Sequence, residues 1–142
     1  MPARIWVAHT AEEIARCLPV IRELRPHLDD EIAFIKRIQR QQRHGYRLAA
    51  LEVGEQVRAV VGFRISESLA RGRHIYVDDL VVSAADRSKG AGKRLFEWLL
   101  VEARDNSCTQ IHLDSEVKHH DTHRFFLARK MEITSHHFAL KL

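Results

Sequence analysis

The chain has 142 residues, a length that suits one domain (1–142) with a single hydrophobic core. Hydrophobic residues make up 45% and charged residues 30%, an ordinary globular composition, and no apolar run approaches the roughly 20 residues needed to span a bilayer. The net charge of +4 fits an anionic ligand, but the basic residues are scattered, so we expect no nucleic-acid partner.

The N-terminal part of the chain predicts a strand and then a helix. Residues 5–8 are predicted as the strand, and Thr10 and Glu13 have the spacing of a capping box at a helix N-terminus. Apolar residues then recur at helical spacing. Pro19 is expected to kink or split this helix, and Pro26 is expected to end it.

A second helix and a hairpin are predicted next. Asp29 and Asp30 can cap the helix, and Gly45 is expected to end it. The expected apolar stripe of this helix consists of Ile32, Ile35 and Ile38. Residues 46–53 and 56–65 are predicted as two strands, and the short turn around Gly54 that joins them predicts a β-hairpin.

The rest of the chain alternates strands and helices. The predicted order is a strand at 74–82, a loop at 87–93, a helix at 94–104, a strand at 110–113, a helix capped by Asp121 and a closing strand at 133–142. Three adjacent strands in the middle favour antiparallel pairing, whereas the later strand–helix–strand unit favours a parallel pair. We therefore expect an α+β fold with a mixed, mostly antiparallel sheet and helices on both faces.

The cysteines and histidines bear on metals and location. Cys17 and Cys108 lie in apolar-periodic segments, which indicates buried thiols rather than a disulfide or metal pair. Residues 119–123 are rich in histidine, but a zinc site needs three or four converging ligands, so we expect no metal. The first residues lack the apolar core of a signal peptide, and we expect a cytoplasmic protein with no membrane partner.

The loop at residues 87–93 is the most informative stretch for function. Its sequence, Arg-Ser-Lys-Gly-Ala-Gly-Lys, lies between a predicted buried strand and a predicted amphipathic helix. The first N–H groups of a helix have no partner inside it, and the helix dipole adds positive potential there. Glycines let an anion approach closely, so the loop predicts a pyrophosphate cradle. A Walker-type loop is disfavoured because Arg94, and not Ser or Thr, follows Lys93.

This loop, the strand before it and the order of the elements together resemble the GCN5-related N-acetyltransferase (GNAT) superfamily, in particular its small stand-alone bacterial members. Residues 87–92 match the signature Arg/Gln-x-x-Gly-x-Gly/Ala, and residues 76–82 resemble the family's fourth strand, where acidic residues precede an apolar trio. The resemblance covers nearly the whole chain. It implies an acetyl-CoA-dependent N-acetyltransferase that acts by direct attack of a primary amine, on a small molecule or on a protein or peptide, in a ternary complex.

The resemblance also implies how acetyl-CoA is bound. Loop N–H groups would bind the pyrophosphate, and strand backbone would pair with the pantetheine arm like an added strand. A β-bulge in that strand would aim an N–H group at the thioester carbonyl. The residues expected to bind the cofactor are Leu80, Val81, Val82, Arg87, Ser88, Lys89, Gly90, Ala91, Gly92, Lys93 and Phe126.

Direct transfer needs an amine that has lost its proton, and an alkyl ammonium has a pKa near ~10, so a base must help. Asp78 and Asp79 are the best candidates. Strand alternation places them on opposite faces, which a bulge could change, and Asp78 is slightly favoured because it shares a face with Tyr76, the third candidate catalytic residue. The alternative is a structural role for one or both, such as pairing with arginine.

One departure from the family pattern concerns the general acid. The family usually has Phe-Tyr where this chain has Phe125-Phe126. In the family the hydroxyl of that tyrosine protonates the departing thiolate, and Phe126 has no such hydroxyl. Tyr76, His119, His120 or water would then have to replace it. The alternative function is an acyl-CoA-binding module with weak or no catalysis. The acceptor stays open, as does the choice between a monomer and a homodimer paired through residues 138–142.

Overall fold

The computed structural model describes residues 2–87 and 89–142. The chain divides into two compact units, one ending at His112 and one formed by Leu113–Leu142. Each unit is described by itself, and the expectation of a single domain over the whole chain stays a prediction.

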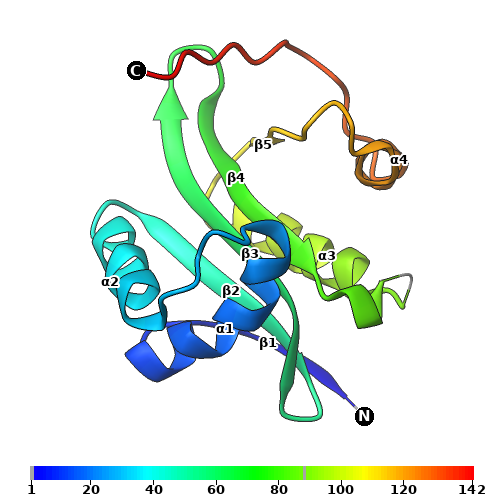
Figure 1. Ribbon diagram of the computed structural model, residues 1–142. Helices are drawn as coiled ribbons and strands as arrows, with labels where there is room; N and C mark the ends of the chain where they lie inside the picture. The colour runs from blue at the N-terminus through cyan, green and yellow to red at the C-terminus, as the bar shows by residue number, and fades with distance from the viewer. Residues whose placement is uncertain (1, 88) are drawn as a thin grey trace. The chain divides into compact units, whose positions relative to one another are not determined.

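A five-stranded sheet in the order β1-β2-β3-β4-β5 forms the first unit (Figure 1). Its strands are β1 (Ala3–Val7), β2 (Tyr46–Val53), β3 (Gln56–Ser68), β4 (Gly72–Val82) and β5 (Gln110–Leu113). The first four strands form three antiparallel pairs, β1 with β2, β2 with β3 and β3 with β4. β5 follows a helical crossover and lies beside β4, which makes the sheet mixed. The predicted mixed, mostly antiparallel sheet is thus confirmed.

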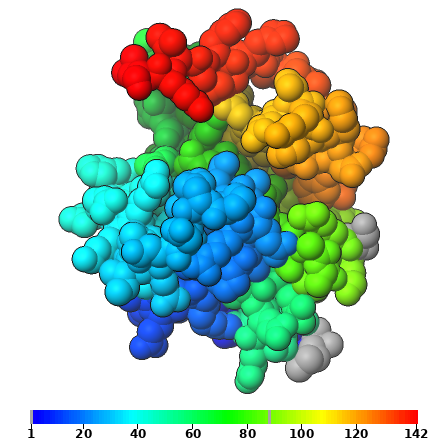
Figure 2. Space-filling model, in the orientation of Figure 1, coloured from blue at the N-terminus to red at the C-terminus, as the bar shows by residue number. Residues whose placement is uncertain are grey.

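Helices cover both faces of this sheet. They are α1 (Ala11–Leu24), α2 (Glu31–Gln42), α3 (Ala91–Asp105) and the short 3-10 helix η1 (Ala84–Asp86). Leu48 and Val60 belong to a core shared with α1 and α2, which lie side by side in Figure 2 in blue and cyan. Phe63 points to the other face and meets Trp98 of α3 edge to face, with ring centroids 5.9 Å apart. Alternation along the strands therefore divides the apolar residues between two helical layers.

Local signals in the sequence account for the helix boundaries of α1. Thr10 and Glu13 form the predicted capping box, with each side chain accepting a hydrogen bond from the other residue's N–H group. α1 ends at Leu24, two residues before Pro26. Pro19 lies inside one continuous helix, so the predicted split does not occur.

The packing face of α2 differs from the predicted one. Asp30 caps the helix as expected, its side chain accepting from the N–H of Ala33 at 3.0 Å. Phe34 and Ile38 are the buried residues, whereas Ile32 is 66% exposed. The predicted stripe was wrong at Ile32 because an aromatic side chain two residues later occupies the core.

The second unit contains α4 (His120–Ala128) and an extended tail. Asp121 does not cap α4, because the helix begins at His120 and its N-cap residue is His119. Asp121 lies inside the helix, where it pairs with Arg124. The predicted closing strand at 133–142 is also wrong, since the described residues after Ala128 contain no strand. Ile133 and Phe138 are 80% and 92% exposed, so the alternating pattern there has no ladder partner.

Among the residues that the structure describes, no helix is both long and apolar enough to cross a bilayer.

Candidate functional site

The N-terminus of α3 is open to an anion. Gly90 is the N-cap residue, with φ at 86°, a left-handed conformation that glycine adopts without steric cost. It has no side chain to cap the helix, and the first N–H groups of α3, from Ala91 to Lys93, have no partner among the described residues, so they can bind an external acceptor. The N–H of Lys89 donates to Asp86 O at 3.3 Å and is therefore used within the loop.

Three charged or polar contacts fix the segment that leads into this helix. Arg58 on β3 pairs with Asp86 at 3.2 Å, and its carbonyl accepts from the N–H of Ser83 at 2.8 Å. Glu23 on α1 accepts from the N–H of Ala84 at 2.8 Å. The start of α3 is thus tied to the sheet and to α1. Arg87, Lys89 and Lys93 are exposed at this end, and Ser88, also predicted to bind the cofactor, lies outside the described residues.

The C-terminal end of β4 offers backbone groups on its outer side. The bond from Ser83 N–H to Arg58 O shows which residues of β4 face β3. In an antiparallel ladder, successive residues point their backbone N–H and C=O groups alternately toward and away from the partner strand. Val81, which lies opposite Val60, therefore points these groups toward β3. Leu80 and Val82 therefore turn theirs away from β3.

β5 is too short to use those groups. The N–H of Thr109, just before β5, donates to Arg73 O at 3.0 Å, near the start of β4. Four residues running parallel from there span only the first part of the eleven-residue β4. In the described sheet, Leu80 and Val82 thus lie on an edge that no strand pairs with. Of the three predicted residues Leu80, Val81 and Val82, only Leu80 and Val82 can pair with an extended ligand through their backbone.

A β-bulge in β4 directly precedes this edge and contains one of the two carboxylates. Gly62 pairs with Asp79 and the next residue, Phe63, pairs with Val77, which leaves Asp78 as the extra residue on β4. The bulge expected in this strand is confirmed. It interrupts the alternation that would otherwise place Asp78 and Asp79 on opposite faces.

Both carboxylates join one hydrogen-bonded network. Asp79 accepts from the Tyr46 hydroxyl at 2.8 Å and from Arg25 Nε at 3.2 Å. Asp78 accepts from Arg64 Nε at 3.0 Å, and its backbone carbonyl accepts from Arg25 Nη2 at 3.2 Å. The pairing with arginine that the sequence left open is therefore present at both residues.

Solvent access distinguishes the two carboxylates. The side chains of Asp78 and Asp79 are 34% and 21% exposed. Both oxygens of Asp79 accept a hydrogen bond, whereas among the described residues only one oxygen of Asp78 does. Asp78 therefore keeps a lone pair for a proton from outside the protein. Tyr76 is half-buried and lies opposite Arg64 in the ladder between β3 and β4.

Four residues of this network escaped the sequence analysis, namely Arg25, Tyr46, Gly62 and Arg64. One signal for them existed. A glycine inside a strand indicates a bulge or a close approach, and a Cβ on Gly62 would overlap the hydroxyl of Tyr46. No sequence signal identified the two arginines, which come from the end of α1 and from β3.

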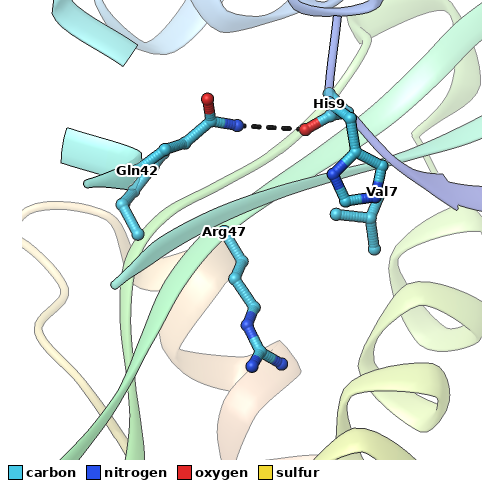
Figure 3. A pocket seen from close by; sticks show the side chains of 6 residues that line it. Val7, His9, Gln42 and Arg47 are labelled. Carbon is cyan, nitrogen blue, oxygen red and sulfur yellow. Dashed lines mark hydrogen bonds between the residues drawn. The ribbon is translucent and has the colours of Figure 1, made fainter. Parts of the chain in front are cut away.

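A cavity of about 440 Å³ lies where β1 ends and β2 begins, and Gln42 Nε2 donates to Ala8 O at 3.0 Å at its rim (Figure 3). It is lined by Val7, Ala8, His9, Gln42, Tyr46 and Arg47, so of the network only Tyr46 reaches it. The described residues contain no group of three or more His, Cys, Asp or Glu side chains placed to hold a metal ion.

Phe126 belongs to the second unit. It is the buried residue of α4 and meets Phe125 edge to face, with centroids 5.4 Å apart. Arg129 lies over the Phe125 ring, 4.7 Å from its centroid. The role of Phe126 toward the cofactor stays a prediction.

Comparisons with known proteins agree with the resemblance seen in the sequence. Residues 8–131 match the family described as "Acetyltransferase (GNAT) family". The curated protein "Uncharacterized N-acetyltransferase YhdJ" of Bacillus subtilis (strain 168) is 35% identical over 116 residues, which cover 81% of each chain.

Solved structures show the same fold at low sequence identity. A ribosomal-protein-alanine N-acetyltransferase from Brucella melitensis biovar Abortus 2308 has a TM-score of 0.84 at 15% identity and covers 99% of both chains. AAC(6')-Iy, solved in complex with the bisubstrate analog CoA-S-monomethyl-acetylneamine, has a TM-score of 0.84 at 13% identity and covers 100% of this chain and 99% of its own. These likenesses confirm the predicted fold.

Proposed function

The chain belongs to the acetyltransferase (GNAT) family of acetyl-CoA-dependent acyltransferases, and we propose that it transfers the acetyl group to a primary amine, of a small molecule or of a protein or peptide, by direct attack in a ternary complex. The observation that carries this proposal is the bulge at Asp78, which places the Asp78 and Asp79 carboxylates directly before the strand edge at Leu80 and Val82. The two buried, free cysteines fit the cytoplasmic location that we propose with it.

Backbone groups would hold acetyl-CoA. The N–H groups at the start of α3 suit its pyrophosphate, with Arg87, Lys89 and Lys93 adding charge from exposed positions. The edge at Leu80 and Val82 suits the amides of the pantetheine arm, which would pair as an added strand. These features support the fit of the cofactor because each supplies backbone groups that have no partner among the described residues. Bound acetyl-CoA supplies an acyl group on a thiolate leaving group.

Asp78 is the base in this proposal. An acceptor amine arrives largely as an ammonium ion, because the pKa of an alkyl ammonium is near ~10, and must lose a proton before its nitrogen can attack. The Asp78 oxygen without a hydrogen-bond partner among the described residues would accept that proton, directly or through water. Asp79, with both oxygens engaged, would keep the bulge in place instead.

The proton needed by the departing thiolate has to come from elsewhere than residue 126. Phe126 has no hydroxyl, and Tyr76 on β4 or water is the proposed source. General-acid assistance contributes roughly 10²–10⁴-fold, so its loss slows transfer without abolishing it. The same residue supports the second candidate function, an acyl-CoA-binding module with weak or no catalysis.

The names of the structural relatives support amines as the acceptor class. One acts on a ribosomal-protein alanine, and the other was captured with a CoA-linked acetylneamine. The test is to incubate the protein with acetyl-CoA and four amines: a polyamine, an aminoglycoside, a lysine peptide and a peptide with a free N-terminal alanine. Thiol release and the mass of the acetylated product are then measured.

Asp78→Asn is expected to lower kcat by roughly 10²–10⁴-fold without changing the affinity for acetyl-CoA, because the cofactor is held by backbone groups. Asp105→Asn, the same change at the exposed end of α3, is the control and should leave kcat unaltered. Acetyl-CoA binding without any acetylated amine would overturn the transferase proposal and favour the binding module. Equal rates for Asp78→Asn and wild type would remove Asp78 from the role of base.

A further inference from the structure

Tyr46 contacts both arms of the carboxylate network. Its hydroxyl donates to Asp79 Oδ2 at 2.8 Å, and its ring lies under Arg64, whose guanidinium carbon is 5.3 Å from the ring centroid. Arg64 in turn binds Asp78 Oδ2 at 3.0 Å. We propose that Tyr46 is a positioning residue for acetyl transfer, holding Asp79 through its hydroxyl and Asp78 through Arg64. This inference rests on the proposed function, in which Asp78 takes the proton of the amine.

The burial of Tyr46 suits it for orienting other groups. Only 3% of the residue is exposed, and it is the first residue of β2. Burial, and after it the negative charge of Asp79, raise the pKa of its hydroxyl well above the usual value. The hydroxyl therefore stays protonated at the pH values at which an amine is acetylated, and it remains a donor to Asp79. A neutral donor fixes the carboxylate without neutralising it.

Gly62 is the reason that Tyr46 reaches Asp79. The two residues Gly62 and Asp79 face each other in the ladder between β3 and β4, and a Cβ on Gly62 would overlap the Tyr46 hydroxyl. A glycine inside a strand often marks a place where another group comes close to the backbone. At Gly62 that group is the ring of Tyr46, which crosses β3 there.

Arg25 carries the effect of Tyr46 to the backbone of the bulge. It binds the other oxygen of Asp79 through Nε and the carbonyl of Asp78 through Nη2, each at 3.2 Å. The hydrogen bonds of the described residues thus join four charged side chains at the bulge, namely Asp78, Asp79, Arg25 and Arg64. Without the Tyr46 hydroxyl, Asp79 would be held on one side only, and Arg25 would no longer fix the Asp78 carbonyl in one position.

The first test compares Tyr46→Phe with Trp6→Phe. Each change removes one donor to a carboxylate, because Trp6 Nε1 donates to Glu52 Oε1 at 3.1 Å at the far end of β2. We expect Tyr46→Phe to lower kcat by roughly 10-fold or more, with the KM for acetyl-CoA unchanged, because small misplacements of a reacting group are costly. Trp6→Phe should leave kcat unchanged. Equal kcat values for wild type and Tyr46→Phe, in an enzyme that does acetylate amines, would overturn this inference alone.

Gly62→Ala provides a second route to the same displacement. Its added methyl group forces the Tyr46 hydroxyl away from Asp79 while keeping the hydroxyl itself. We expect kcat to fall with the KM for acetyl-CoA unchanged, as in Tyr46→Phe. An unaltered kcat in a folded Gly62→Ala protein would contradict the positioning role.

A spectroscopic test does not depend on activity. The chain has two tyrosines, so a Tyr76→Phe background leaves Tyr46 as the only phenol that titrates in the ultraviolet. We expect its titration to lie well above the ordinary range and to move down when Asp79→Asn removes the adjacent charge. If Tyr46 titrates in the ordinary range and Asp79→Asn does not shift that titration, the contact is absent and the positioning inference is overturned, whether or not the wild-type protein acetylates an amine. If the wild-type protein acetylates none of the amines, the proposed function is rejected.

Discussion

Two glycines of the candidate site are required for different physical reasons. Gly90 has a positive φ of 86° at the start of α3, a conformation in which any other L-residue is strained. Gly62 has no unusual φ, and its role is to leave space for a neighbouring side chain. The first therefore shapes the proposed cofactor site through backbone direction, and the second shapes the carboxylate pair through packing.

Gly90→Ala is predicted to weaken acetyl-CoA binding more than it weakens the fold. Left-handed backbone costs a non-glycine residue about 1–2 kcal/mol, and relief of that strain would turn the first N–H groups of α3 away from a shared target. The affinity is measured by isothermal titration calorimetry and the stability by urea unfolding.

Gly45→Ala is the matched control for this experiment. Gly45 has φ at 90° in the turn before β2, and a Cβ there meets nothing within 4 Å. Both variants should lose similar stability, and only Gly90→Ala should lose affinity for acetyl-CoA. A similar loss of affinity in both would show that strain, and not the direction of the N–H groups, is responsible.

At this scale the sequence predicted residue types better than contacts. It singled out Asp78, Asp79 and the glycines of the loop, because their pattern along the chain carries chemistry. It could not show that Tyr46, 33 positions away, donates to Asp79, because that contact depends on the register between three strands. Nor could it show which of Leu80, Val81 and Val82 faces β3, since ladder facing is set by the partner strand.

The elements themselves are held by caps and by an ion cluster that lies several residues along the strands from Asp78 and Asp79. At the far end of β2 the largely buried carboxylate of Glu52 accepts from Arg16 at 2.5 Å, Arg4 at 3.3 Å and Trp6 at 3.1 Å. These donors come from α1 and β1. Glu52 therefore joins three elements of the first unit through a single side chain.

Glu52→Gln is predicted to cost about 1–2 kcal/mol of stability at neutral pH, because the donors lose a charged acceptor. The hydrogen bond from Arg16 is the largest cause of a pKa for Glu52 below its usual value. The contribution of ionised Glu52 to the stability of the fold is therefore full above the pKa of an unfolded glutamate, near ~4.3. It is lost as the pH falls through the lower pKa that Glu52 has in the folded state. Urea unfolding of both proteins at pH 7 and at pH 3 should show a smaller difference at pH 3. A difference that is the same at both pH values would contradict this account.

Elements were predictable where a local signal coincided with the period of the apolar residues. β2 and β5 have the predicted bounds, and α1 begins at its capping box, because turn glycines and caps act within a few residues. The prediction of a strand at residues 133–142 was wrong for a physical reason. An alternating pattern such as that of residues 138–142 favours a strand only when a partner supplies hydrogen bonds, and the sequence does not name the partner.

At the scale of the whole molecule, the order of the elements predicted the mixed, mostly antiparallel character of the sheet, although it also predicted a further strand at 133–142 that the described residues do not form. Adjacent strands with short connections pair antiparallel, and one helical crossover adds a parallel strand, so few arrangements remain. The functional consequence of that order is the edge of β4. A short β5 beside a long β4 leaves Leu80 and Val82 unpaired within the described sheet, next to the helix that begins at the glycine loop. The account of the protein as an acetyl-CoA enzyme depends on this backbone surface.

The most direct test is therefore to map acetyl-CoA binding on the backbone by amide NMR of the ¹⁵N-labelled protein. We predict that acetyl-CoA shifts the amide signals of Leu80, Val82 and residues 90–93 most strongly, and that the amide of Val81, which faces β3, moves less. Shifts concentrated instead around His9 and Arg47, at the cavity of Figure 3, would contradict the central claim, as would no shift at millimolar acetyl-CoA.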